Sequence, residues 1–446
     1  MRGRVGFDLT EEISYRIGRA FAQHLMARRI AVGSDVRLSS PSLKAALIDG
    51  ILDAGSDAID IGLSGTEEIY FASFHWDIDG AVEITASHNP ADYNGMKFVG
   101  AAGRPIGIDD EFAAIKQLAT EAKFIQASPR GKLSSKSIIE PYVEHLLGCI
   151  DLELLAPMKI LVDAGNGAAG HVIDALEQRF KARNVPVTFI KINHQPDGSF
   201  PNGVPNPLLP EKRSITSQAV RLHAADIGIA WDGDFDRCFL FDQKGEYIAG
   251  SYMAGLLAKI LLAKNPNSTF VIDPRLNWNT LDILKNSAAK FVSSRTGHTF
   301  FKQIMRQEKA DYGGEISAHH YFKNFAYCDS GMIPWLLVIE YLGKSGQKLH
   351  EIVNARKLLL PCSDEINFKV KNVAGAIGRV RQHYAAHANS IEETDGISVE
   401  LQDCRFNLRG SNTEALLRLN VETRANPALL DQMIGEIGRL IDGAIS

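Results

Sequence analysis

The stretch KILVD at residues 159–163 decides the fold, because it is an apolar strand that ends in an aspartate. A helical stretch and a second strand follow it, and the same order of elements occurs in two other places. The three copies are strands 30–35, 159–163 and 269–273, helices 43–54, 169–180 and 279–287, and strands 58–63, 187–192 and 291–294. Strand–helix–strand order predicts parallel pairing with crossover helices. The sequence therefore predicts three related mixed α/β domains.

The last part of the chain, from about Pro361, has a different pattern. It predicts strands at 365–370, 397–401 and 415–421 and helices at 373–386 and 427–445, which together form an α+β unit. We expect four domains. Their predicted bounds are 1–135, 136–243, 244–358 and 359–446.

Composition excludes several classes of protein. The chain has 446 residues, of which 45% are hydrophobic and 23% charged, with a formal net charge of -5 and scattered basic residues, which argues against nucleic acid as a partner. Its five cysteines lack the spacing of a zinc site or a disulfide framework. No window approaches the ~20 apolar residues that span a bilayer, and the apolar stretch 332–342 is interpreted as a core helix. We expect a cytoplasmic protein with no membrane role.

TASHNP at residues 85–90 follows the apolar strand 80–84 and carries one serine, Ser87. Because a proline disfavours helical geometry at the residue before it, the chain must turn here rather than continue into a helix. The sequence predicts an exposed turn at a strand end, where α/β proteins usually place their chemistry. An ordinary turn with a helix cap remains the alternative.

DGDFDR at residues 232–237 follows another apolar strand and places three aspartates at a spacing of two. In an extended chain these side chains project to one face, where their carboxylates repel each other unless a cation neutralises them. Oxygen ligands alone suit a hard ion such as Mg²⁺. The alternative is a solvated acidic turn. An EF-hand is excluded because hydrophobic strand flanks the loop and the twelfth position lacks an acidic ligand.

Two further polar loops suggest ligand contacts. GGEISAHH at 313–320 offers donors and acceptors suited to sugar hydroxyls, although a buried polar turn is an equal alternative. His319 and His320 are not expected to form a metal pair, because neighbouring side chains point apart. RGSNT at 409–413 could hold a phosphate, and the alternative is a polar turn between strands.

These four segments, in this order, resemble the α-D-phosphohexomutase family over essentially the whole chain. TASHNP is similar to the family's phosphoserine loop, DGDFDR to its metal loop, GEISAHH to its sugar loop and RGSNTE to its phosphate-binding loop. The segments 65–70 and 193–210 look like the bacterial phosphomannomutase branch, which serves GDP-mannose synthesis. The resemblance implies three mixed α/β domains and a C-terminal α+β domain, similar to TATA-box-binding protein, around a central cleft.

The resemblance also implies roles for single residues. Ser87 carries the phosphoryl group, and one of its phosphate oxygens completes a Mg²⁺ site. The expected metal ligands are Ser87, Asp232, Asp234 and Asp236. The expected substrate-binding residues are Glu315, Ser317, His319, Arg409, Ser411, Asn412 and Thr413. The residues that match positions lining the cleft are Lys97, Arg237 and His298.

The implied activity is interconversion of mannose 6-phosphate and mannose 1-phosphate through a phosphoserine and a hexose 1,6-bisphosphate. His298 and Lys97 are the expected candidates for moving the hydroxyl proton. A dual phosphomannomutase/phosphoglucomutase and a phosphoglucosamine mutase remain alternatives. A Mg²⁺-dependent sugar phosphatase and a catalytically silent sugar-phosphate-binding protein are less favoured. We expect hexose phosphates as the partners and a monomer or weak homodimer.

One departure from the family concerns the start of the chain. The family's first strand and a loop often reading YDIRG precede a position like Arg2-Gly3, where this sequence begins. If the true start lies upstream, Arg2 is the substrate-facing arginine of that loop. If it does not, the first sheet is expected to have an unpaired edge.

Overall fold

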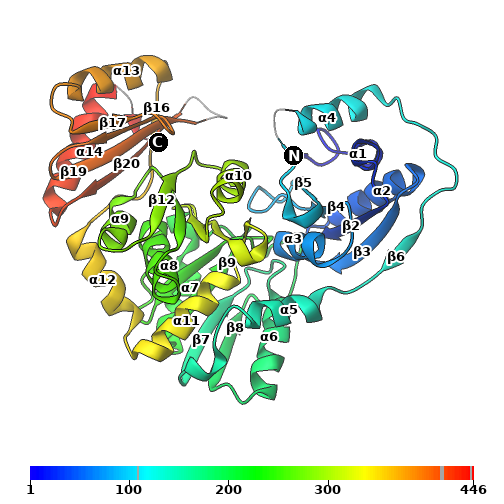
Figure 1. Ribbon diagram of the computed structural model, residues 1–446, viewed down its shortest axis with the longest axis horizontal. Helices are drawn as coiled ribbons and strands as arrows, with labels where there is room; N and C mark the ends of the chain where they lie inside the picture. The colour runs from blue at the N-terminus through cyan, green and yellow to red at the C-terminus, as the bar shows by residue number, and fades with distance from the viewer. Residues whose placement is uncertain (108–109, 412–415, 442–443, 446) are drawn as a thin grey trace. The chain divides into compact units, whose positions relative to one another are not determined.

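The computed structural model describes residues 1–107, 110–411, 416–441 and 444–445. The chain divides into two compact units. The first comprises Met1–Tyr247 and His319–Gly346, and the second comprises Ile248–Ala318 and Gln347–Ser446. Figure 1 shows their helices and strands in chain order from blue to red.

The first sheet of the first unit is mixed and has the order β1-β5-β4-β2-β3-β6. Strands β4, β2, β3 and β6 are parallel, whereas β5 is antiparallel to β4 and β1 is antiparallel to β5. The strands are β1 (Arg2–Arg4), β2 (Arg29–Ser34), β3 (Asp57–Leu63), β4 (Gly80–Ile84), β5 (Tyr93–Gly100) and β6 (Leu133–Ser135). The helices are α1 (Glu11–Leu25), α2 (Ser40–Asp53), α3 (Thr66–His75) and α4 (Glu111–Glu121). Strand β1 pairs with β5 and forms one edge of this sheet.

Helices α1 and α2 pack closely because each has a glycine at their contact. A Cβ atom at Gly18 of α1 would collide with the Leu47 carbonyl, and one at Gly50 of α2 would collide with the Tyr15 carbonyl. Their apolar faces bury Phe21 and other residues in one core beneath the parallel strands. This packing fixes the strands whose ends carry the site.

The second sheet of the first unit has the order β10-β9-β7-β8, in which β8, β7 and β9 are parallel and β10 is antiparallel. Its strands are β7 (Met158–Asp163), β8 (Val187–Ile192), β9 (Ile227–Trp231) and β10 (Cys238–Asp242). Its helices are α5 (Ile139–Leu147), α6 (Gly170–Ala182) and α7 (Ser214–Leu222). The unit also contains the antiparallel pair β14 (His320–Phe322) and β15 (Cys328–Asp329), and α11 (Ile333–Ser345). Helix α11 is almost wholly buried, which confirms the predicted core helix.

The second unit contains parallel strands and an antiparallel sheet. Strands β12, β11 and β13 are parallel neighbours. The elements of this part are α8 (Gly250–Lys264), β11 (Thr269–Ile272), α9 (Trp278–Leu284), β12 (Lys290–Ser293), α10 (His298–Glu308), β13 (Tyr312–Gly314) and α12 (Leu349–Leu359). Helix α9 ends three residues before the predicted bound of 287.

The C-terminal sheet is antiparallel throughout, with the order β17-β18-β19-β20-β16-β21. Its strands are β16 (Ile366–Lys369), β17 (Ser390–Glu392), β18 (Ile397–Glu400), β19 (Cys404–Gly410), β20 (Leu416–Thr423) and β21 (Ala444–Ile445). Helices α13 (Val373–Tyr384) and α14 (Pro427–Ile441) share its apolar core. The predicted helix 427–445 was too long, because β21 occupies its last two positions.

The three repeated strands end in the same kind of turn. The Oδ1 of each terminal aspartate accepts the backbone N–H two residues later, over 3.0 Å at Asp35 and Asp163 and over 2.9 Å at Asp273. Such a side-chain hydrogen bond closes a turn without any hydrogen bond from a neighbouring strand. The repeat predicted from sequence is therefore also a repeat of local hydrogen bonding.

Glu67 of α3 fixes the start of α11. Its carboxylate accepts hydrogen bonds from the hydroxyls of Tyr142 (2.8 Å) and Ser330 (2.6 Å), from Met332 N–H (2.9 Å) and from Gly331 N–H. The side chain is completely buried. Because all four partners donate, the site needs a group that only accepts.

We expect Glu67→Gln to lower the free energy of unfolding by about 2–3 kcal/mol, because one arm of the amide would face buried donors that lose their acceptor. Urea unfolding of the purified protein measures this. Glu153→Gln, at an exposed turn, is the control and should leave stability unchanged. Equal stability of both variants would contradict the assignment.

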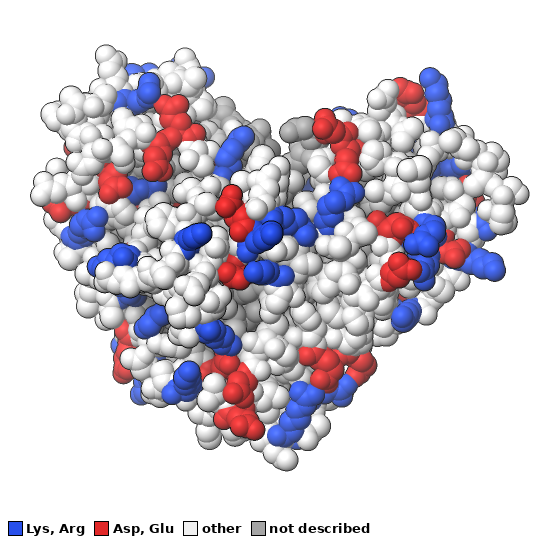
Figure 2. Space-filling view, viewed as in Figure 1, with Lys and Arg blue, Asp and Glu red and all other residues white. Residues whose placement is uncertain are grey.

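Two further features concern the helices and the surface charge. Among the described helices, none is both long and apolar enough to span a bilayer. On the face shown in Figure 2, Lys and Arg side chains are interspersed with Asp and Glu and form no stripe of one sign.

Candidate active site

Ser87 lies at the carboxyl end of β4 in the left-handed backbone region, with a φ of 51°. Its N–H donates to Thr85 Oγ1 over 2.8 Å, and its Oγ donates to Asp232 Oδ2 over 2.7 Å. The side chain is only 2% exposed, so the prediction of an exposed turn is wrong. The reason is that the aspartate loop covers it: a Cβ atom at Gly233 would lie 2.6 Å from the Ser87 carbonyl oxygen.

Arg37 shapes the loop that carries Ser87. Its guanidinium donates to the carbonyls of Pro90 (2.7 Å) and Tyr93 (2.8 Å) through Nη1, and to those of Ser87 (2.9 Å) and Asn89 (2.7 Å) through Nη2. It is 1% exposed. Arg37 was not predicted from the sequence, although its position two residues after the strand-end Asp35 was a usable signal.

We expect Arg37→Met to lower the free energy of unfolding by about 3 kcal/mol, because four carbonyls lose a buried donor and Asp35 loses its counter-charge. It should also lower turnover, since the Ser87 loop loses its support. Thermal unfolding and turnover of one preparation measure both effects. Arg130→Met, which removes only an exposed pair with Asp49 and Asp53, is the control. Wild-type stability of Arg37→Met would contradict the role.

The three aspartates among the predicted metal ligands lie together and are buried. Asp232, Asp234 and Asp236 each offer a carboxylate oxygen, and these oxygens lie within 4.8 Å of one another. The Oδ1 of each is buried and has no hydrogen-bond partner among the residues that the structure describes. Buried carboxylates with unused oxygens fit a hard divalent cation. The residues therefore satisfy the chemistry expected of a magnesium site.

Lys97 of β5 neutralises part of this charge. Its Nζ lies 2.7 Å from Asp234 Oδ2 and also contacts Asp236 Oδ2, while Thr66 Oγ1 donates to Asp234 over 2.7 Å. Burial opposes a charged lysine, but Asp234 and Asp236 outweigh it and raise the pKa of Lys97. Burial and repulsion from Asp234 raise the pKa of Asp236 to about 6. Lys97 is therefore a cation in this arrangement.

His88 and Arg237 complete the surroundings of Ser87. The Nδ1 of His88 lies 3.0 Å from Ser87 Oγ and 2.5 Å from Arg237 Nη2, which also donates to Asp232 over 2.7 Å. Burial lowers the pKa of His88 to about 2, and the charge of Arg237 adds to the effect. His88 is therefore neutral. The sequence analysis quoted it within TASHNP but gave it no role.

Arg2 and His319 also reach this part of the first unit. Arg2 of β1 donates to Asn89 Oδ1 over 2.5 Å. His319 Nδ1 lies 2.8 Å from Asp329 Oδ2, and these two residues group with Asp236. Burial opposes protonation of His319, but the carboxylates of Asp236 and Asp329 outweigh it and raise its pKa.

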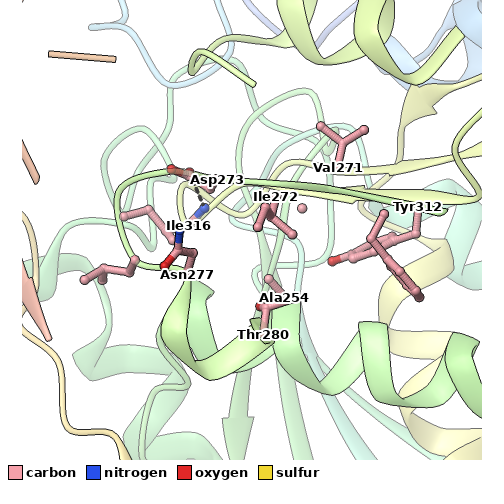
Figure 3. A pocket seen from close by; sticks show the side chains of 11 residues that line it. Ala254, Val271, Ile272, Asp273, Asn277, Thr280, Tyr312 and Ile316 are labelled. Atoms are coloured by element: carbon pink, nitrogen blue, oxygen red, sulfur yellow. Dashed lines mark hydrogen bonds between the residues drawn. The ribbon is translucent and has the colours of Figure 1, made fainter. Parts of the chain in front are cut away.

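The predicted sugar loop continues in the second unit, where Asp273 and Arg275 support it. Glu315 Oε2 accepts the Gly297 N–H over 3.0 Å and lies 3.7 Å from Arg275 Nη2. Figure 3 shows Asp273 beside Ile316, whose N–H donates to Asp273 Oδ2 over 3.0 Å. The small cavity there measures about 10 Å³, which is room for one water at most. Ser317 is half-buried, and His298 is exposed as the first residue of α10.

The predicted phosphate loop follows β19. Arg409 Nη2 donates to Glu365 Oε2 over 2.9 Å, and Glu365 also lies 3.5 Å from Arg275 Nη1 and 3.2 Å from Arg418 Nη1. Three guanidinium groups around one carboxylate form a basic cluster suited to an anion. The sequence analysis missed Glu365, Arg275 and Arg418. Ser411 N–H pairs with Leu416, whereas Asn412 and Thr413 lie outside the described residues.

The structure thus gathers the predicted residues Arg2, Ser87, Lys97, Asp232, Asp234, Asp236, Arg237 and His319 within the first unit. The other described site residues lie in the second unit, namely His298, Glu315, Ser317, Arg409 and Ser411.

Several known proteins are similar to this chain over nearly its full length. A phosphomannomutase of Escherichia coli is 55% identical over 99% of this chain and 97% of its own. A phosphomannomutase of Vibrio cholerae serotype O1 is 50% identical over 99% and 96%. A crystal structure of a phosphoglucomutase/phosphomannomutase family protein from Burkholderia thailandensis is 28% identical, with a TM-score of 0.88 over 100% of this chain and 97% of that one.

Four domain descriptions of one family also match consecutive parts of the chain. They are phosphoglucomutase/phosphomannomutase alpha/beta/alpha domain I at residues 1–126, domain II at 140–245, domain III at 249–358 and the C-terminal domain at 365–438. These matches confirm the predicted fold class, three mixed α/β domains followed by an antiparallel-sheet domain. The chain belongs to the phosphoglucomutase/phosphomannomutase family.

Proposed function

We propose that this chain interconverts mannose 6-phosphate and mannose 1-phosphate through a phosphoserine at Ser87 and a hexose 1,6-bisphosphate. The observation that carries the proposal is the 2.7 Å contact between Ser87 Oγ and the buried aspartate cluster. The full-length relatives named phosphomannomutase support the choice of mannose.

Asp232, Asp234 and Asp236 would hold Mg²⁺, with an oxygen of the phosphorylated Ser87 as a further ligand. When bound, the ion neutralises charge on the phosphoryl oxygens. Their three unused buried Oδ1 atoms support this assignment. Lys97 contacts two of the aspartates, and it becomes available to phosphate oxygens once another cation takes its place.

The reaction then needs two phosphoryl transfers in opposite directions. In the first, the Ser87 Oγ–P bond breaks while a new bond forms between phosphorus and a hydroxyl oxygen of the hexose monophosphate, whose proton leaves. In the second, the other phosphate of the bisphosphate returns to Ser87 Oγ, and the sugar oxygen regains a proton. Arg237 contacts both His88 and Asp232 and so holds the surroundings of Ser87 for both steps.

The basic cluster of Arg275, Arg409 and Arg418 would hold the phosphate that is not reacting. Glu315 and Ser317 would bind sugar hydroxyls that look alike after the bisphosphate has turned end for end. His298 and Lys97 remain the two candidates for moving the hydroxyl proton.

A coupled assay with mannose 1-phosphate, glucose 1-phosphate and glucosamine 1-phosphate tests the substrate, with glucose 1,6-bisphosphate present. We expect the highest kcat/KM for mannose 1-phosphate. Equal values for mannose and glucose would reject the narrow assignment in favour of a dual mutase. Release of inorganic phosphate without bisphosphate would instead support a phosphatase, and binding without turnover would support a silent binding protein.

A further inference from the structure

The two oxygens of each carboxylate in the aspartate cluster have different surroundings. Every Oδ2 contacts a donor of the protein, whereas every Oδ1 is buried and has no hydrogen-bond partner among the described residues. The groups at the Oδ2 atoms are Ser87 and Arg237 at Asp232, Thr66 and Lys97 at Asp234, and Lys97 at Asp236. One oxygen of each aspartate is therefore in use, and the other is open to a cation.

Thr66 differs in kind from the other groups at these oxygens. Lys97 and Arg237 are cations, so a metal ion bound to the same carboxylates repels them. The Ser87 hydroxyl loses its hydrogen when the residue carries a phosphoryl group. The Thr66 hydroxyl is neutral and takes no part in the chemistry, so its hydrogen bond to Asp234 persists when an ion binds.

Thr66 contacts both the backbone and the side chain of Asp234. It is completely buried and begins α3, where backbone N–H groups have no partner within the helix. Its N–H donates to the Asp234 carbonyl over 3.2 Å, and its Oγ1 donates to Oδ2 over 2.7 Å. A Cβ atom at Gly65 would lie 2.6 Å from the same carbonyl oxygen, so the two segments meet at backbone distance.

The start of α3 is itself anchored on both sides. Glu68 Oε2 accepts the Gly65 N–H over 3.0 Å, and Glu68 Oε1 lies 3.0 Å from His171 Nε2 on α6. The neighbouring Glu67 binds the start of α11. Thr66 is thus held in one position, and its branched side chain has few rotamers. Segment 65–70 carried part of the family resemblance, but the sequence analysis gave Thr66 no role.

An aspartate whose Oδ2 is occupied can offer a metal ion one oxygen only. Mg²⁺ suits such single oxygens, because it binds six ligands in an octahedron at about 2.0–2.1 Å. Ca²⁺ is larger, takes about six to eight oxygens and often binds both oxygens of one carboxylate. A hydrogen bond that reserves Oδ2 therefore favours the smaller ion.

We propose that Thr66 is a positioning residue that keeps Asp234 a single-oxygen ligand and so makes the cluster select Mg²⁺ against Ca²⁺. The inference rests on the metal site of the proposed function. It goes beyond that site by assigning its selectivity to a residue outside the aspartate loop.

Isothermal titration with Mg²⁺ and with Ca²⁺, in the absence of sugar phosphate, tests the proposal. Thr66→Val keeps the shape of the side chain and removes the hydroxyl. We expect the ratio of the Ca²⁺ Kd to the Mg²⁺ Kd to fall at least about fivefold, because Oδ2 becomes available to the larger ion. Thr66→Ser retains a hydroxyl and should keep the wild-type ratio. A general loosening of the site would weaken both ions alike and leave the ratio unchanged.

Thr216→Val is the matched control. Thr216 is also buried, and its Oγ1 donates to an aspartate outside the cluster, Asp163 Oδ2, over 2.7 Å. This variant should keep the wild-type ratio. Thr66→Cys, which leaves only a weak S–H donor, is a second variant in case Thr66→Val does not fold, and it should lower the ratio too.

A wild-type ratio in the folded Val or Cys variant would overturn the role of Thr66, as would an equal fall in Thr66→Ser and Thr66→Val. These outcomes leave the metal site itself in place if Asp234→Asn still weakens Mg²⁺ binding. Wild-type protein that binds neither ion would instead reject the metal site of the proposed function, and the role of Thr66 with it.

Discussion

Replacing Ser87 by alanine is expected to lower kcat of the mutase reaction by about a thousandfold or more, because no other group can carry the phosphoryl group between the two oxygens of the sugar. The hydroxyl is the only part removed. Asp232 loses one hydrogen bond of 2.7 Å, and the backbone turn keeps its bond to Thr85. Hexose phosphate binding should therefore survive.

Intact-protein mass and turnover measure this prediction together. Wild-type protein treated with glucose 1,6-bisphosphate should gain one phosphoryl group, and Ser87→Ala should gain none. Ser42→Ala, at an exposed serine of α2, is the control and should keep both phosphorylation and activity. Full turnover by Ser87→Ala would refute the phosphoserine role.

Replacing Asp234 by asparagine should weaken Mg²⁺ binding at least about tenfold and lower turnover accordingly, because one of the three buried carboxylates becomes neutral. The Asp234 carboxylate also accepts hydrogen bonds from Thr66 and Lys97. The amide oxygen of an asparagine would be a weaker acceptor for both donors. Chelation of divalent metal should abolish wild-type turnover, and added Mg²⁺ should restore it.

Isothermal titration with Mg²⁺ measures the affinity of the variant. Unfolding of the same sample shows whether a loss of affinity is a folding defect. Asp174 lies on α6, away from the cluster, and its carboxylate pairs with Lys191 and His194. Asp174→Asn is therefore the matched control. Wild-type affinity for Mg²⁺ in Asp234→Asn would remove this residue from the metal site.

The fold and the family were predictable because their signals are local in sequence. Each repeated strand is a short apolar run with its own terminal aspartate, and each functional loop is a contiguous motif. Strand β19 was missed even though Cys404, Phe406 and Leu408 alternate with polar residues, a pattern typical of a strand. All five residues from Cys404 to Leu408 are buried, since Arg405 pairs with Glu422.

The features that the sequence could not predict depend on contacts between residues that lie far apart in the chain. Ser87 is covered by Asp232, which lies 145 positions later in the chain, and no local pattern records that contact. Nor does any pattern show that Arg37 turns inward to four carbonyls. The cations around Glu365 were missed for the same reason, because they come from separate strands and loops. Local chemistry was thus foreseeable, whereas burial and electrostatic partners were not.

The three aspartate turns have a consequence for the residues that donate to them. In each turn the aspartate accepts a backbone N–H, which every residue except proline possesses, so this hydrogen bond does not by itself select the side chain of the donating residue. The three donating residues differ in what their other contacts do. Arg37 supports the serine loop, Gly165 lies close against Pro205 with a left-handed backbone, and Arg275 joins the basic cluster. The same kind of hydrogen bond thus closes all three turns, while the residue that donates it has a different role in each.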